Sequence, residues 1–506
     1  MEDISLVTVV LMLPLVGLIP LLFVRKLSDQ TIRWITLTVS LATFAVSLLL
    51  VTNFDKAVNG LQMVTNWKWI DADNFTIRYY VGIDGISLWL VLLSTFIMPL
   101  AILASFGSIK DRVRLYHIFM LLMEWAMIGV FVAQDLFLFY VFWEVTLVPM
   151  YFLIGIWGGE ERIYAAVKFF LYTMGGSLLM LLAILWLGSE AGTFSVPDIL
   201  AKMSSGELAF SQSTERWLFL AFGIAFAIKV PMWPLHSWLP DAHVQAPTAG
   251  SVILAGVLLK MGTYGFVRFN LPLFPEASKD FAPYIAVLAV IGIIYGAWVS
   301  YGQKDVKKLV AYSSISHLGF VMLGIFALNS VGVQGGILQM VNHGISTGGL
   351  FLMVGMLYER RHTKLMNAFG GIWKVMPLFA GMSLVVTLSS MGLPGLNGFV
   401  GEFTILLGSS GSDQLSWWFT AFAALGIILA AVYMLYMWNS VFMGALDKEE
   451  NKRLPDMNWT EIWSLVPILI MIFFIGLQAS YFFGFMDGSV GELMNQMQGA
   501  ATAFGR

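Results

Sequence analysis

Six ionisable side chains stand inside long apolar stretches of this sequence. Three are acids and three are bases: Glu124, Glu144, Lys168, Lys229, Lys260 and Glu402. A charged side chain at the centre of a lipid bilayer costs about 2.5 to 3.5 kcal/mol on insertion scales, so each of these residues needs a partner or a function. The proton affinity of a buried lysine depends strongly on whether a carboxylate lies beside it. We therefore expect this set of residues to bind and release protons within a membrane.

Two of the lysines are the main candidates for proton transfer. Lys229 stands just before a proline-containing break, and Lys260 lies in the middle of the next apolar stretch. A lysine tuned by its surroundings serves as a proton-transfer group. The alternative for both residues is a fixed salt bridge. Lys168 lies near the inner end of its apolar stretch, where a long side chain can also reach water without any function.

The three carboxylates are expected to act with these lysines. Glu124 and Glu144 lie about ten residues on either side of the turn at 133–135. They should therefore stand at similar depth on neighbouring antiparallel helices, where they could share a polar cavity. A purely structural role is the alternative for Glu124. Glu402 lies toward the outer end of its stretch, where a carboxylate suits the exit of protons.

Histidines extend the set. His317 and His343 lie at similar depth on neighbouring apolar stretches, and His343 belongs to a stripe with Gln339 and Thr347 on one helix face. A relay of neutral imidazoles fits these polar neighbours. Ligation of a haem and a role as satisfied core histidines are the alternatives.

Two further histidines lie between the main lysines. His236 and His243 flank the predicted turn that joins two apolar stretches, together with Asp241 and Gln245. These polar groups could admit water from the inner side. Helix capping and turn formation explain them equally well.

Long apolar segments must position these residues. The chain is 58% hydrophobic and 12% charged, about half the charged fraction of a soluble globular protein. Segments long enough to cross a bilayer can be separated by their charged loops. The expected fold is an all-α, polytopic membrane protein with about fourteen transmembrane helices. The segments are 5–24, 33–53, 83–105, 115–133, 136–157, 163–188, 216–239, 246–268, 282–301, 308–328, 331–357, 375–408, 416–445 and 461–485.

The distribution of basic residues sets the expected orientation. Most of the 28 Lys and Arg residues fall in or beside loops that follow odd-numbered helices. By the positive-inside rule, both termini face outward. Glu2 and Asp3 precede the first apolar run, which we interpret as a retained helix rather than a signal peptide. The outer loop 54–82 is expected to form a small hairpin around Asp73-Asn74.

Two apolar segments are interrupted in the same way. Pro231 and Pro234 fall near the middle of the seventh segment and should free the carbonyls of Ala227 and Val230, while Pro394 stands among glycines in the twelfth. Irregular backbone at membrane depth survives only where protein or water satisfies it, and matched breaks indicate an internal repeat with ion sites. Because the breaks lie five helices apart, the repeats should be inverted. Simple proline kinks are the alternative.

This interpretation divides the chain into four parts. Residues 1–114 hold the first three helices and the hairpin, 115–270 the first five-helix repeat, 280–446 the second, and 447–506 the last helix and an outer tail.

The composition also excludes several functions. With no cysteine, the chain cannot bind an iron–sulfur cluster, a c-type haem or a thiolate zinc site. We expect no metal site, and we find no nucleotide-binding motif. The net charge of −3 gives no indication of a nucleic-acid partner.

The sequence resembles the antiporter-like subunits of respiratory complex I, or NADH-quinone oxidoreductase, and of multisubunit sodium/proton antiporters. The resemblance covers nearly the whole chain. The motifs that carry it are Phe142-Trp143-Glu144, Lys229-Val230-Pro231, Pro234-Leu235-His236-Ser237-Trp238, Leu258-Leu259-Lys260-Met261-Gly262, Ser316-His317 and Gly392-Leu393-Pro394-Gly395 with Gly401-Glu402.

The resemblance implies roles for these residues. Glu144 and Lys229 would form a controlling ion pair, Lys260 and His317 a central relay, and Glu402 the terminal site, with Glu124, Lys168, His236, His243 and His343 in support. Glu402 favours the M-type branch, because other members usually carry lysine there. L-type members add a long C-terminal lateral helix for which this length leaves no room.

The resemblance also implies the setting. The chain would pump protons in a bacterial cytoplasmic (inner) membrane, beside L- and N-type subunits of the complex I membrane arm. It would hold no cofactor itself, and FMN, iron–sulfur clusters and quinone would bind to partner subunits. A subunit of a sodium/proton antiporter is the nearest alternative, and an electron carrier that binds haem or quinone through His317 and His343 is the second.

Overall fold

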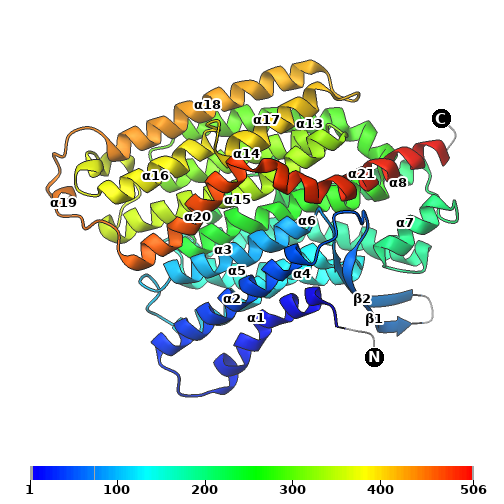
Figure 1. The fold of residues 1–506 in the computed structure, drawn as a ribbon, viewed down its shortest axis with the longest axis horizontal. Coiled ribbons are helices and arrows are strands. Elements are labelled where there is room, and N and C mark those ends of the chain that lie inside the picture. Colours follow the sequence, from blue (N-terminus) through cyan, green and yellow to red (C-terminus); the bar gives the residue numbers. More distant parts are fainter. Residues whose placement is uncertain (1–3, 73–74, 504–506) are drawn as a thin grey trace.

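Long helices that run in roughly the same direction form most of the molecule (Figure 1). The computed structural model describes residues 4–72 and 75–503. The first half contains α1 (Leu6–Phe23), α2 (Asp29–Thr52), β1 (Gln62–Ala72), β2 (Phe75–Ile83), α3 (Leu88–Ala104), α4 (Val113–Val132), α5 (Leu136–Trp157), α6 (Arg162–Ala191), α7 (Val196–Ser204), α8 (Gln212–Lys229), α9 (Trp238–Gln245), α10 (Thr248–Ile253), η1 (Leu254–Leu258), α11 (Leu259–Gly265), η2 (Phe266–Asn270) and α12 (Leu271–Leu273).

Among its described residues, the second half contains helices joined by loops and no named strand. It contains α13 (Pro275–Tyr301), α14 (Val306–Ile325), α15 (Ser330–Arg361), η3 (Met366–Ala368), η4 (Ile372–Lys374), α16 (Pro377–Ser390), α17 (Asn397–Ser410), α18 (Trp417–Phe442), α19 (Glu449–Lys452), α20 (Trp459–Leu477) and α21 (Ala479–Ala503).

Helices occupy all fourteen predicted segments. Eleven of the described helices are long and apolar enough to cross a membrane. The other three segments contain the shorter helix α3 and two interrupted helices, α8 with α9 and α16 with α17. The membrane-protein class is therefore confirmed, and the number of fourteen crossings stays a prediction.

The predicted hairpin is present. Strands β1 and β2 pair in antiparallel register from Gln62↔Ile83 to Ala72↔Phe75. The turn predicted at Asp73-Asn74 lies outside the described residues. Gln134 donates its backbone N–H to the carbonyl of Tyr80 at 2.8 Å, which fixes the hairpin to the end of α4. The hairpin, α7 and both ends of the chain lie at the same end of the bundle, opposite α19 (Figure 1).

The first predicted break separates α8 from α9. Helix α8 ends at Lys229, and α9 begins only at Trp238. The carbonyl of Ala227 is not free, contrary to the prediction, because it accepts the backbone N–H of Met232 at 2.8 Å. The indole of Trp238 donates to the carbonyl of Ile228 at 2.9 Å. Protein groups therefore satisfy the interrupted backbone, as an apolar surrounding requires.

The second predicted break separates α16 from α17. Gly392 and Gly395 adopt φ angles of 78° and 91°, a region that L side chains rarely enter. Hydrogen bonds through Asn397 join the two sides of the break. Its side chain accepts one from Ser389, and its backbone carbonyl accepts one from the side-chain amide of Asn342 at 2.7 Å.

The span that carries Lys260 is irregular and central. All of the apolar window of Thr248–Leu273 is buried inside the chain, as is that of α15, whereas only 28% of the α18 window is. Two π-helical turns, η1 and η2, lie on either side of α11. Such turns often occur at functional sites, and here both lie in the helix with the central lysine.

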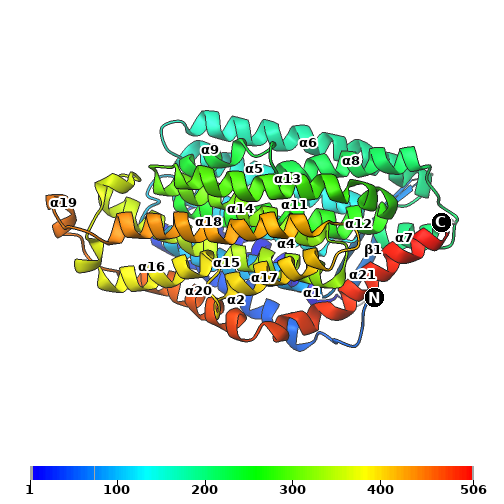
Figure 2. The ribbon, with the colours of Figure 1, turned by 90° about the horizontal axis from the view of Figure 1, so that it is seen from above.

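The end of the chain differs from the prediction. The last predicted span, 461–485, is divided at Gln478, and the expected tail is the helix α21, which runs obliquely along the bundle (Figure 2). Its buried residues Phe482, Met486 and Val490 recur at helical spacing, while Asp487, Glu492 and Gln496 lie among its other positions. This amphipathic pattern stabilises a helix on a surface. The short helix α7 was not predicted either.

We expect the break after α16 to be sensitive to a single methyl group. A Cβ at Gly398 would lie 2.1 Å from the carbonyl oxygen of Ser389, whereas a Cβ at Gly381 in α16 would have no neighbour within 4 Å. Gly398→Ala should therefore destabilise the chain by about 1 to 3 kcal/mol. The thermal midpoint of the purified complex should fall for Gly398→Ala and stay within error for Gly381→Ala. Equal midpoints would refute this packing.

Candidate functional site

A row of ionisable side chains crosses the centre of the bundle. The Nζ atom of Lys260 on α11 lies 2.6 Å from Nδ1 of His343 on α15. Next along the row, Nδ1 of His317 on α14 lies 2.7 Å from Oε1 of Glu402 on α17. The two imidazole rings are 5.8 Å apart between centroids. The structure thus brings together four of the residues singled out in the sequence.

Polar neighbours fix the part of this row that contains His317 and Glu402. The amide of Gln339 donates to Oε1 of Glu402 at 3.1 Å. The hydroxyl of Tyr433 lies 3.1 Å from Nε2 of His317. Tyr433 was missed in the sequence, because one buried tyrosine among many aromatic residues of an apolar helix gives no signal before its partner is known.

The space beside the row is small. His317, His343, Glu402 and neighbouring side chains line a cavity of about 10 Å³, close to the least volume that holds one water molecule. A haem does not fit there. Both nitrogens of His317 are already engaged by Glu402 and Tyr433, so the geometry contradicts the haem alternative.

Lys229 has a different environment. Its Nζ atom has no hydrogen-bond partner among the described residues, and it lies 5.3 Å from the ring centroid of Trp143 and 5.7 Å from that of Phe169. The side chain is completely buried. Within the described chain, no carboxylate oxygen lies within 4.0 Å of it. The expected ion pair with Glu144 is therefore open in this structure.

Glu124 and Glu144 do not share an observed contact. The carboxylate of Glu124 accepts a hydrogen bond from Ser40 of α2 at 3.0 Å and is completely buried. Glu144 is partly exposed, and its neighbour Trp143 contacts Lys229. Glu124 and Glu144 were predicted at similar depth on adjacent helices, but depth does not determine where a side chain points. Side chains on two packed helices can point to opposite sides.

Lys168 is paired. Its ammonium lies 2.7 Å from the carboxylate of Asp241, and the two side chains are 22% and 34% exposed. This contact connects α6 with α9. His236 lies nearby in the break, with Nε2 3.3 Å from the hydroxyl of Tyr295.

His243 is buried in the last turn of α9, at the end of that helix away from the break. Its ring stacks on Phe351 with centroids 4.4 Å apart, and neither ring nitrogen has a hydrogen-bond partner among the described residues. Two lysines not singled out in the sequence cap the end of α9. Lys307 donates to the carbonyl of Ala246 at 2.6 Å, and Lys364 donates to that of Val244 at 2.8 Å.

This arrangement suits proton transfer. Lysine, imidazole and carboxylate groups exchange protons across hydrogen bonds of the lengths seen here. Among the described residues, no group of three His, Asp or Glu side chains is arranged to hold a metal ion.

Comparisons with known proteins identify the family of the chain. Residues 133–430 match the family described as NADH:quinone oxidoreductase/Mrp antiporter, TM, and residues 9–132 match the amino terminus of NADH-ubiquinone oxidoreductase chain 4. The fold and the buried row thus define an antiporter-like membrane subunit.

Individual relatives narrow the assignment. The chain is 45% identical over 501 residues to NADH-quinone oxidoreductase subunit M of Rhodobacter capsulatus, with 97% of this chain and 96% of that protein covered. It is 44% identical over 482 residues to chain 4 of Arabidopsis thaliana, with 95% of each covered. A chain of respiratory complex I from Thermus thermophilus superposes with a TM-score of 0.86 at 31% identity, covering 98% of this chain and 99% of that one. The chain belongs to the NADH-quinone oxidoreductase subunit M family.

We expect Tyr433 to position His317. Tyr433→Phe removes one hydrogen bond, worth about 0.5 to 1.5 kcal/mol, and should slow proton pumping by the assembled complex about two- to tenfold. Tyr436 on the same helix is 41% exposed, so Tyr436→Phe is the matched control. Pumping can be followed as acidification of inverted membrane vesicles on addition of NADH. Equal rates in both variants would show that the hydroxyl has no part in the relay.

Proposed function

We propose that this chain translocates protons across the membrane as a subunit of NADH-quinone oxidoreductase, through its buried Lys, His and Glu side chains. The observation that carries this proposal is the central row, in which Lys260 meets His343 and His317 meets Glu402. Both contacts lie among buried residues. A permanent charge there would be unfavourable in free energy, and proton transfer accounts for the presence of ionisable groups in such a place.

The order of the contacts supports a direction of transfer. A protonated Lys260 donates to Nδ1 of His343, whose other ring nitrogen has no partner among the described residues. His317 stands next, and its contact with Glu402 leads the proton to the carboxylate. Each imidazole accepts a proton at one nitrogen and releases one at the other.

Lys229 is the proposed control point. It is held only by aromatic ring faces, which stabilise an ammonium more weakly than a carboxylate does. Approach of Glu144 would favour the charged form of Lys229, and its withdrawal would favour release of a proton. The Lys168–Asp241 contact and the polar residues His236, His243 and Glu124 support this region.

The proposal includes the internal symmetry. Two inverted five-helix repeats, 115–270 and 280–446, would each contain one interrupted helix, within a total of fourteen crossings. The breaks after Lys229 and after Ser390, and the position of both termini at the end that carries the hairpin, support it. Residues 1–114 and 447–506 would flank the repeats, and both termini would face outward from a bacterial cytoplasmic membrane.

In the assembled enzyme, the redox chemistry would belong to other chains. FMN, iron–sulfur clusters and quinone would bind to partner subunits, and L- and N-type subunits would lie beside this chain in the bilayer. The absence of cysteine in the sequence supports this division.

Removing the ammonium of Lys229 tests the control point. Lys229→Met keeps the length of the side chain, and it should reduce proton pumping by the assembled complex at least about tenfold, together with coupled quinone reduction. Glu144→Gln should have the same direction of effect. Lys202→Met is the control, because Lys202 lies on α7 and pairs with Glu207. Full pumping by an assembled Lys229→Met complex would remove Lys229 from the mechanism.

Substitutions of Glu402 distinguish a role in proton exit from a purely structural role. Glu402→Ala should abolish most pumping, because His317 loses its acceptor, whereas Glu402→Lys should be milder, since a lysine can also carry a proton at that position. Vesicle acidification should be measured with and without sodium, which also tests the antiporter alternative. Equal loss in the two variants would contradict the exit role.

A further inference from the structure

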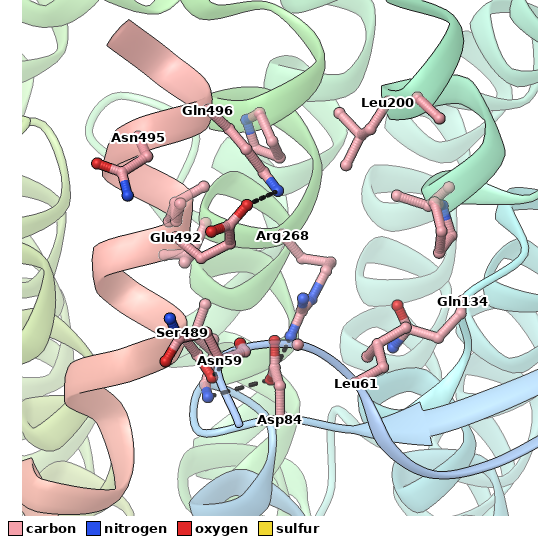
Figure 3. A pocket seen from close by; sticks show the side chains of 18 of the residues that line it. Asn59, Leu61, Asp84, Gln134, Leu200, Arg268, Ser489, Glu492, Asn495 and Gln496 are labelled. Carbon is pink, nitrogen blue, oxygen red and sulfur yellow. Dashed lines mark hydrogen bonds and ion pairs between the residues drawn. The ribbon is translucent and has the colours of Figure 1, made fainter. Parts of the chain in front are cut away.

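A large pocket opens at the end of the bundle that carries the hairpin and the termini. Its volume is about 790 Å³, enough for on the order of 25 water molecules at the density of liquid water. Helices α7 and α21 form two walls, and the turn η2 of the central span forms the floor (Figure 3). Its polar lining includes Asn59, Gln134, Ser489, Glu492, Asn495 and Gln496.

A buried ion pair lies on this floor. The guanidinium of Arg268 contacts Oδ1 of Asp84 at 2.6 Å, and the side chains are only 12% and 7% exposed. Oδ1 of Asp84 also accepts the backbone N–H groups of Ile86 at 3.1 Å and Ser87 at 3.0 Å. A buried ion pair seldom adds stability beyond that of apolar residues of the same size, so another role should account for it.

Hydrogen bonds connect the Arg268–Asp84 pair to a residue on the same helix face as Lys260. Nε of Arg268 donates to the hydroxyl of Tyr264 at 3.0 Å, and that hydroxyl donates to the carbonyl of Phe131 at 3.0 Å. Lys260, Tyr264 and Arg268 follow one another at intervals of four residues. At 1.5 Å per residue, Lys260 lies about 12 Å along the helix from the floor of the pocket.

We propose that this pocket is the outer water vestibule of Lys260, and that the Arg268–Asp84 pair is the barrier that separates its water from the central row. The occupant is water carrying protons, and the inference rests on the proton-translocating function proposed above. A guanidinium does not release its proton, and a fixed positive charge at a constriction repels protons. Arg268 therefore blocks return of protons from the outer side while it remains in place.

The contacts also suggest how the barrier opens. The Tyr264 hydroxyl accepts a hydrogen bond from Arg268 and donates its own proton to the carbonyl of Phe131, so that proton is not available to water while these bonds stand. Glu492 on α21 is the second acid that lines the pocket. A shift of the guanidinium from Asp84 toward Glu492 frees the hydroxyl for water.

Neutralising the barrier tests this inference without leaving an unpaired charge. The double variant Asp84→Asn with Arg268→Gln, in the whole complex in liposomes without NADH, should dissipate an imposed pH gradient at least about threefold faster than the unmodified complex. Arg216→Gln with Asp280→Asn is the matched control, because that bonded pair is 46% and 37% exposed. Adding Lys260→Ala to the first variant should return the leak to its original rate. An unchanged leak, or one that persists without Lys260, overturns the proposal.

A second measurement tests access to the floor. The natural chain has no cysteine, so Arg268→Cys introduces a single thiol into this subunit. A membrane-impermeant trimethylammonium-ethyl thiosulfonate, applied from the outer side, should modify that thiol, restore a positive charge and slow the leak, whereas a neutral methyl thiosulfonate should not slow it. No modification from the outer side overturns the vestibule.

These outcomes are separable from those of the proposed function. Normal pumping in Lys229→Met would contradict the control point and leave the leak measurement intact. A fast leak through Lys260 would establish the vestibule in either case.

Discussion

The low polarity of the bundle interior is the constraint on which the rest of the structure depends. A charge there must be stabilised by protein groups, and the chain does this in different ways. Lys260 has an imidazole and a backbone carbonyl as partners, and Glu402 has an imidazole and an amide. Among the described residues, Lys229 has only ring faces. Lys260 and Glu402 are held by hydrogen bonds, whereas the charge of Lys229 depends on what approaches it. This difference is why Lys260 suits the relay of protons and Lys229 suits the control of their transfer.

The interrupted helices follow from the same constraint. A regular helix satisfies its own backbone and offers no backbone group to a buried charge, and three of the six ionisable residues lie close to a place where the regular pattern changes. Lys229 ends α8, Lys260 lies between two π-helical turns, and Glu402 follows the break that begins after Ser390. At each break, a side chain donates a hydrogen bond to a backbone carbonyl: Trp238 donates to that of Ile228, and Asn342 donates to that of Asn397. Each break is therefore accompanied by a polar side chain that forms a hydrogen bond with a backbone carbonyl near it.

The sequence predicted the positions of these features better than their partners. Charges in apolar stretches, Pro/Gly breaks and the hairpin are local patterns, and the structure contains all of them. The direction in which a side chain points depends on packing between distant segments, so the contact of Glu124 with Ser40 and that of Tyr433 with His317 were not foreseen. Helix α21 was missed for another reason. Its apolar stripe is interrupted by polar residues at regular intervals, and hydropathy averaged over a window hides such a pattern.

The cavity beside the central row and the pocket at the hairpin end of the bundle differ greatly in size, and this difference bears on how leakage is avoided. The cavity beside His317 and His343 is about 10 Å³, whereas the outer pocket is about 790 Å³. A continuous water file through the row would conduct protons at all times and dissipate the gradient. With side chains in contact and room for about one water, transfer requires a rearrangement of His343, His317 or their partners. Water at the outer end can then be abundant without harm, provided that a charged pair closes the short distance between it and Lys260.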